Sequence, residues 1–147
     1  FRFPIDVMIP LAGGRQHQGT NNMTGAARLF FTLAIVYALL GIILGLSMAI
    51  STDHGQKVTH AHIMLAGWVS SALFAFFYHL LPALNSSRIA MAHFWLQTAS
   101  AVVMLVSLFF LYGGNPAFDP GAAIGSIGYA LGMVLFAYIA LPAIWKA

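Results

Sequence analysis

The sequence predicts an all-α integral membrane protein, a bundle of four transmembrane helices in a single domain. Hydrophobic residues make up 61% of its 147 residues and charged residues only 6%, unlike the composition of soluble domains. The apolar residues form four runs, each close to the roughly 20 residues that a helix needs to cross a bilayer. The polar breaks between the runs are short, which favours antiparallel neighbouring helices.

The expected helices lie near residues 28–51, 59–82, 89–112 and 121–145. The breaks between them carry polar and charged residues, namely Asp53, His54, Lys57, Asn85, Arg88 and Asp119. Residues 1–27 lack the charged, then apolar, then cleavable pattern of a secretory signal. We interpret them as an N-terminal arm that does not span the membrane.

The distribution of cationic residues predicts the orientation, because cytoplasmic flanks hold the excess of Lys and Arg. The arm, the second link and the C-terminus would share one side, which holds Arg2, Arg15, Arg28, Arg88 and Lys146. The opposite side holds only Lys57. We therefore expect both termini in the cytoplasm of a bacterial inner membrane, with the 51–58 link outside.

The absence of cysteine narrows the chemistry. The chain contains no Cys, which excludes thiolate-bound iron–sulfur clusters, structural Cys-zinc sites, disulfides and covalent CxxCH heme attachment. Any iron or copper must be held by His, Met or oxygen ligands. The net charge of +3 contains no basic run, so nucleic acid is not an expected partner.

Two histidines at the outer start of the second helix are the leading site candidates. His60 and His62 would be costly in hydrocarbon without partners, and imidazole is a good ligand for heme iron. Residues two apart on a helix point about 200° apart, so the pair should not chelate one ion. Each would share a six-coordinate heme with a neighbouring protomer in a closed ring. Hydrogen bonding between helices is the alternative role.

The other candidates are weaker. His79 and His93 would lie at the opposite end of the bundle from His60, where they could contact water and headgroups or form a copper site with Tyr78 and Asn85. His54 and Lys57 are either solvated or contacts of heme propionates. Met64 is either a packing residue or an axial ligand, and Trp68 is either a packing residue or a wall of the heme pocket. Glycine faces fit packing within the chain better than an oligomer contact; they comprise Gly41, Gly45, Gly121, Gly125, Gly128 and Gly132.

Two segments carry a family resemblance. The stretch Val58-Thr59-His60-Ala61-His62-Ile63-Met64, with Trp68 and Tyr78-His79-Leu80-Leu81-Pro82, resembles the second helix of the catalytic subunit of heme-copper oxidases and nitric oxide reductases. There a Thr-His pair supplies an axial ligand of the low-spin heme. Arg88 to Leu96, with its Phe94-Trp95-Leu96 ending, resembles that family's third helix. The resemblance covers roughly residues 28–112, and the fourth helix fits by position only.

The resemblance implies a trimer. The family's subunit has three four-helix arcs around a pseudo-threefold axis, and this chain resembles one arc. His60-Ala61-His62 also resembles the His-x-His pair of the family's tenth helix, which sends one imidazole to each heme. The family's copper ligands and cross-linked Tyr-His pair have no counterpart here.

Three functions follow as hypotheses. The first is a b-type heme protein for electron transfer, bound through His60 and His62, with a quinol or cytochrome as redox partner. The second is an oxygen- or nitric oxide-reactive heme or heme-copper enzyme, in which one histidine leaves an open position on iron. The third is a structural or assembly subunit without heme.

Overall fold

The computed structural model describes residues 22–145, and every regular element in that range is helical. Four stretches are long and apolar enough to cross a membrane, namely Gly25–Ser51, Lys57–Leu80, Arg88–Tyr112 and Pro116–Trp145. This confirms the predicted all-α class with four spans. Residues 1–21 of the expected N-terminal arm, with Arg2 and Arg15, lie outside the described residues, as does Lys146.

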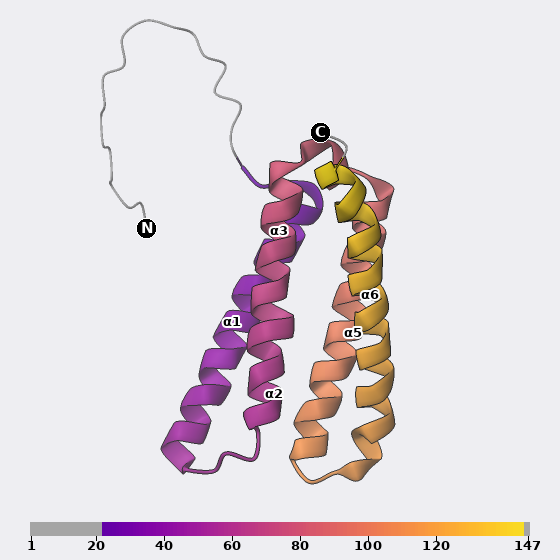
Figure 1. Ribbon diagram of the computed structural model, residues 1–147. Helices are drawn as coiled ribbons and strands as arrows, with labels where there is room; N and C mark the ends of the chain where they lie inside the picture. Colours follow the sequence, from indigo (N-terminus) through magenta and orange to yellow (C-terminus); the bar gives the residue numbers. More distant parts are fainter. Residues whose placement is uncertain (1–21, 146–147) are drawn as a thin grey trace, which may run out of the picture.

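The described residues form eight helical elements, and all but α4 belong to the four spans (Figure 1). In chain order they are α1 (Gly25–Ser51), α2 (Lys57–His62), η1 (Ile63–Val69), α3 (Ser70–Leu80), α4 (Pro82–Asn85), α5 (Arg88–Tyr112), η2 (Pro116–Phe118) and α6 (Asp119–Trp145). The second span ends at Leu80, slightly before the expected limit near 82. Pro82 disfavours helical geometry at the residue before it, and Leu81 is accordingly non-helical with φ −123° and ψ 73°.

Two antiparallel hairpins make up the bundle. One pairs α1 with the α2–η1–α3 span and the other pairs α5 with α6 (Figure 1). Glycines of α6 let the second hairpin pack closely, since a Cβ added at Gly125 would meet the backbone of Met104 and one at Gly128 would meet Ser100. Gly41 and Gly45 make the same kind of contact between α1 and the second span. These glycines serve packing within the chain, as preferred from the sequence.

The hairpins meet through an aromatic cluster near the end of the bundle that carries Arg28 and Arg88, here called the Arg88 end. Phe30 of α1 packs on Phe94 and His93 of α5 with ring centroids 5.0 and 5.2 Å apart. Phe136 of α6 joins the cluster through Phe74 of α3. These rings therefore join all four spans near the Arg88 end.

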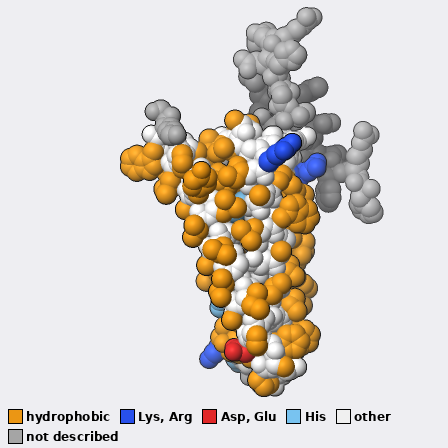
Figure 2. All heavy atoms as spheres, turned by 90° about the vertical axis from the view of Figure 1, so that its right-hand side faces the viewer, with side chains coloured by type: hydrophobic (Ala, Val, Ile, Leu, Met, Phe, Trp, Pro, Cys, Tyr) orange, Lys and Arg blue, Asp and Glu red, His pale blue; other side chains and the backbone are white. Residues whose placement is uncertain are grey.

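The surface fits a membrane-spanning bundle. Hydrophobic side chains cover the visible face between its two ends, while Lys or Arg side chains lie near both ends and acidic side chains near the lower one (Figure 2). Half or more of the side chain is exposed at Leu39, Ile43, Leu73 and Tyr138. Such an apolar belt is stable in lipid rather than in water. The cytoplasmic placement of both termini stays a prediction from the charge count.

Candidate functional site

His60 occupies a notch in α1. Its Nδ1 lies 3.0 Å from the carbonyl oxygen of Gly41. The ring also passes over Gly45, where an added Cβ would come within 2.9 Å of the imidazole Cε1. A carbonyl oxygen can only accept a hydrogen bond, so Nδ1 carries the proton and donates it. In the neutral ring, Nε2 then carries the lone pair with which an imidazole binds a metal.

His62 has the same tautomer through a different partner. Its Nδ1 donates to the carbonyl oxygen of Val58, 2.8 Å away in its own helix. The residues from Lys57 to His62 form a regular α-helix, so the two histidines leave it about 200° apart. His60 is directed to α1, and both side chains are half-buried. Two imidazoles, each held at Nδ1 by a backbone carbonyl, therefore leave opposite flanks of one helix.

The pattern of these bonds fits metal-ligating histidines. Such histidines almost always donate the second ring N–H to a carbonyl, a carboxylate or water, which fixes the tautomer and the ring orientation. Within residues 22–145, no group of three or more His, Cys, Asp or Glu side chains is close enough to hold a metal ion. Neither His60 nor His62 therefore belongs to such a group in the described part of the chain.

The remaining residues predicted for the heme site lie in the link before α2, at its first residue and in η1. His54 is exposed in the link before α2, where its Nδ1 lies 3.0 Å from the carbonyl oxygen of Thr52. Lys57 is exposed at the first residue of α2. Met64 fills the notch beside His60, since its sulfur occupies the space that a Cβ of Gly41 would need. Trp68 lies in η1 with 40% of its surface exposed.

The second pair of histidines is divided between two environments. His93 is fully buried, and its Nδ1 lies 3.0 Å from the hydroxyl oxygen of Tyr78. His79 is half-buried in the last turn of α3. Asn85 contacts the start of α1 instead, where its Oδ1 accepts a hydrogen bond of 2.8 Å from the backbone N–H of Ala27. The fold thus brings His93 to Tyr78 and gives Asn85 a helix-capping role.

One feature that the sequence did not indicate is the π-helical stretch η1, directly after the histidine pair. The hydroxyl of Ser70 donates to the carbonyl oxygen of Leu65, 2.9 Å away. The carbonyl of Ala66 accepts from the hydroxyl of Tyr129 in α6 at 3.0 Å. Such wide turns are rare and frequently lie at functional sites. Here the turn connects the span that carries both histidines to the opposite hairpin.

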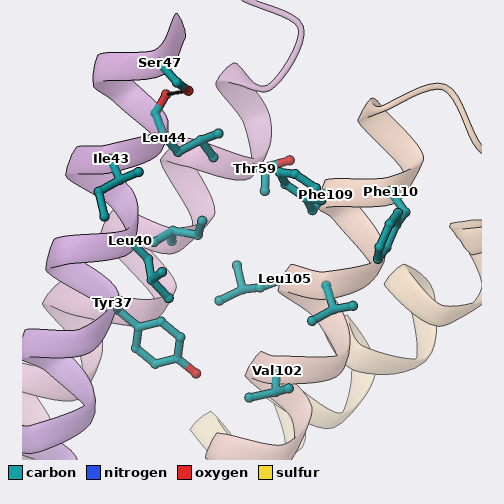
Figure 3. A pocket seen from close by; sticks show the side chains of 12 residues that line it. Tyr37, Leu40, Ile43, Leu44, Ser47, Thr59, Val102, Leu105, Phe109 and Phe110 are labelled. Carbon is teal, nitrogen blue, oxygen red and sulfur yellow. Dashed lines mark hydrogen bonds between the residues drawn. The ribbon is translucent and has the colours of Figure 1, made fainter.

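A cavity of about 480 Å³ is the second feature that the sequence did not indicate. It lies between α1 and α5, and Thr59 and Ile63 of the second span also line it (Figure 3). Neither His60 nor His62 is among its lining residues. The cavity and the histidine pair are therefore two separate candidate sites on neighbouring faces of the second span.

Comparisons with protein-family models, with curated proteins and with solved structures give no match for this chain. The similarity to heme-copper oxidases rests on the two sequence segments alone, Val58–Pro82 and Arg88–Leu96.

Proposed function

We propose that this chain is a b-type membrane heme protein that transfers electrons. His60 of one copy and His62 of the next would hold the heme iron, near the end of the bundle that carries Lys57, here called the Lys57 end. The proposal rests on the fact that the two imidazoles make the same kind of hydrogen bond. Each ring has its Nδ1 within hydrogen-bond distance of a backbone carbonyl oxygen, at 3.0 and 2.8 Å. A neutral imidazole held in this way would offer the lone pair of Nε2 to a metal.

The ligand directions support a site shared between copies. Two imidazoles that leave one helix about 200° apart would not reach one iron, so the proposal gives each of them a counterpart on a neighbouring chain. In a closed ring, every interface repeats the same pair of surfaces. The ring therefore places one His60 and one His62 at each interface. Three copies, each resembling one arc of the heme-copper oxidase subunit, are the proposed number.

The chemistry follows from the ligand set. A heme with two imidazole ligands has no open position on iron and is suited to one-electron exchange. The carbonyl of Gly41 would orient the ring of His60 and increase the basicity of its Nε2. Gly45 leaves room for the ring, and Met64 packs against Gly41 of the same helix. These contacts hold the imidazole of His60 against α1.

The proposed surroundings are a bacterial inner membrane with both termini in the cytoplasm. The histidine pair follows Lys57, the single cation assigned to the outer side. The redox partner would be a quinol within the bilayer or a cytochrome at the outer surface. Copper is a weaker alternative to heme, because each flank of α2 offers one imidazole and no cysteine is present.

A visible spectrum of the purified protein, with heme and iron measured per chain, tests the proposal. We expect about one heme per chain, as one interface per copy requires. The oxidised spectrum should be low-spin, and carbon monoxide should leave the reduced spectrum unchanged. His60→Ala and His62→Ala should each abolish the low-spin spectrum. Ser126→Ala, at an exposed position of α6, is the matched control and should retain it.

Each contrary result of the spectrum favours one of the other two functions. A high-spin spectrum that responds to carbon monoxide would contradict the two-histidine ligation and favour the oxygen- or nitric oxide-reactive enzyme. A colourless preparation without iron or copper, obtained after expression with added heme precursor, would contradict both heme functions. The histidines would then serve only to bridge helices, as in a structural subunit.

A further inference from the structure

Two arginines give the Arg88 end a positive charge that no carboxylate of the described residues balances. Arg28 lies in the first turn of α1 and Arg88 is the first residue of α5, and both are exposed. The acidic residues within 22–145 are Asp53, in the link before α2, and Asp119, the first residue of α6. Both belong to the Lys57 end, and Figure 2 shows acidic side chains only near the lower end of the visible face. The Arg88 end therefore attracts anions.

Asn85 ties the helix starts that carry the two arginines to each other. Its Oδ1 accepts from the backbone N–H of Ala27 at 2.8 Å, and its Nδ2 donates to the carbonyl oxygen of Thr24 at 2.9 Å. Arg28 follows Ala27 directly. Arg88 begins α5 shortly after Asn85 ends α4. Neither α1 nor α5 has an acidic residue in its first turn, where backbone N–H groups add a partial positive charge. The two helix starts thus add to the charge of the arginines.

An apolar pocket of about 470 Å³ opens at the same end of the bundle, and every residue that lines it is apolar. Leu81 and α4 form one wall, and the last turns of α6 form the other, with Ile139, Pro142 and Ala143. Leu84 of α4 connects the pocket to the arginines. Its carbonyl oxygen accepts from the backbone N–H of Ser87 at 2.9 Å, and Ser87 directly precedes Arg88. Cationic surface and an apolar pocket therefore adjoin at one end of the bundle.

A phospholipid with a net negative charge matches this combination. The pocket lies where a span ends, which is the level at which acyl chains meet headgroups in a bilayer. Guanidinium groups bind phosphate oxygens well. A soluble anion would leave the apolar pocket uncovered, and an acyl chain alone would leave the two arginines without a counter-charge. A phospholipid supplies the phosphate and the acyl chain in one molecule.

We propose that the Arg88 end binds an anionic diacyl phospholipid, with its phosphate on Arg28 and Arg88 and one acyl chain in the pocket between α4 and α6. The bound lipid would bridge the two hairpins, because α1 belongs to one and α6 to the other. The site is at the opposite end of the bundle from His60 and His62. It rests on the membrane location of the chain and is independent of heme.

Native mass spectrometry of the full chain in detergent micelles tests this site, with phosphatidylglycerol as the probe. Phosphatidylcholine with the same acyl chains is the matched lipid without net charge. We expect phosphatidylglycerol to bind about tenfold more tightly, since each cation near an anionic headgroup contributes about 1 kcal/mol. By the same relation, Arg28→Gln and Arg88→Gln should each weaken phosphatidylglycerol binding about fivefold. Lys57→Gln removes one cation from the opposite end and should leave the affinity unchanged.

A second pair of variants tests the pocket. Ala143→Phe adds volume to the wall formed by α6 and should weaken phosphatidylglycerol binding severalfold. Ala123→Phe makes the same change at an exposed position near the other end of α6 and should have no effect. Circular dichroism should show the same helical content in all variants, because the arginines and Ala123 are exposed and Ala143 borders an open pocket.

Four results would overturn the site. Equal affinity for the two lipids would show unspecific lipid contact. An equal loss in Lys57→Gln and in the arginine variants would show attraction by net charge alone. Unchanged affinity in folded Ala143→Phe would exclude the pocket, and displacement of the lipid by millimolar inorganic phosphate would show a site for free anions. All of these measurements are made without reference to heme content, so failure of the lipid site and failure of the heme site can be distinguished.

Discussion

The imidazole of His60 donates to the carbonyl oxygen of Gly41 across the contact between α2 and α1, over a distance of 3.0 Å. This bond sets the tautomer of the ring and fixes its direction. A second glycine one turn later, Gly45, leaves the space that the ring occupies. The two small residues of α1 therefore act on His60 as well as on helix packing.

Replacement of Gly45 by alanine should displace His60. The added Cβ would lie 2.9 Å from the imidazole Cε1, too close for an ordinary contact, and overpacking of this kind costs about 1–3 kcal/mol. We expect Gly45→Ala to lower the heme content of the purified protein severalfold. The heme-to-chain ratio measures the effect. Ala49→Val adds volume at an exposed position of the same helix and should leave the ratio unchanged; an equal loss in both variants would contradict this role of Gly45.

The Tyr78–His93 pair should contribute to stability. Tyr78 and His93 are both fully buried, and the hydroxyl oxygen lies 3.0 Å from Nδ1. Tyr78→Phe removes the bond and leaves the imidazole nitrogen buried without it, which should lower the free energy of unfolding by about 1–3 kcal/mol. Reversible unfolding in mixed micelles, followed by circular dichroism, measures the change. An unaltered unfolding free energy would show that the bond has no net effect.

Asn85 should stabilise the start of α1. Its side-chain oxygen accepts from the backbone N–H of Ala27 at 2.8 Å, and its amide nitrogen donates to the carbonyl of Thr24 at 2.9 Å. Asn85→Ala leaves both backbone groups without this partner and should lower the free energy of unfolding by about 1–3 kcal/mol. Asn115→Ala, which removes an exposed cap at the start of η2, should cost less. Equal effects of the two substitutions would contradict the capping role.

The bond between Tyr129 and Ala66 should hold the π-helical turn against α6. The hydroxyl donates to the Ala66 carbonyl at 3.0 Å, and one neutral hydrogen bond contributes about 0.5–1.5 kcal/mol. In Tyr129→Phe, amide hydrogens within η1 should exchange faster by a factor of about 2–10. Hydrogen exchange read by mass spectrometry measures this. Unchanged exchange in η1 would show that the turn is stable without α6.

The helical spans were predictable because length and hydropathy decide them. Four apolar runs separated by polar links allow few other structures in a bilayer. The end of the second span also follows from a sequence signal, since Pro82 acts on Leu81. The opposite directions of His60 and His62 required only regular helix geometry between them, which α2 supplies.

The π-helical turn and the cavity could not be predicted in the same way. A shift of the hydrogen-bond pattern by one residue in η1 changes neither hydropathy nor composition. Phe30 of α1 touches Phe94 of α5, and the cavity lies where the same two helices are further apart. Its presence depends on how the two helices pack in three dimensions. Tyr37 and Thr59 therefore appear ordinary in the sequence, and only their shared burial without partners distinguishes them.

The proposal that heme ligands are shared between copies is tested most directly by mixing two defective subunits. A ring that contains both His60→Ala and His62→Ala chains regenerates an intact pair at one interface. With random assembly of equal amounts into trimers, low-spin heme should return to about a quarter of the wild-type amount per chain. Each variant alone should show none. Full low-spin heme in either variant alone, or no recovery in co-assembled mixtures, would contradict ligation between subunits.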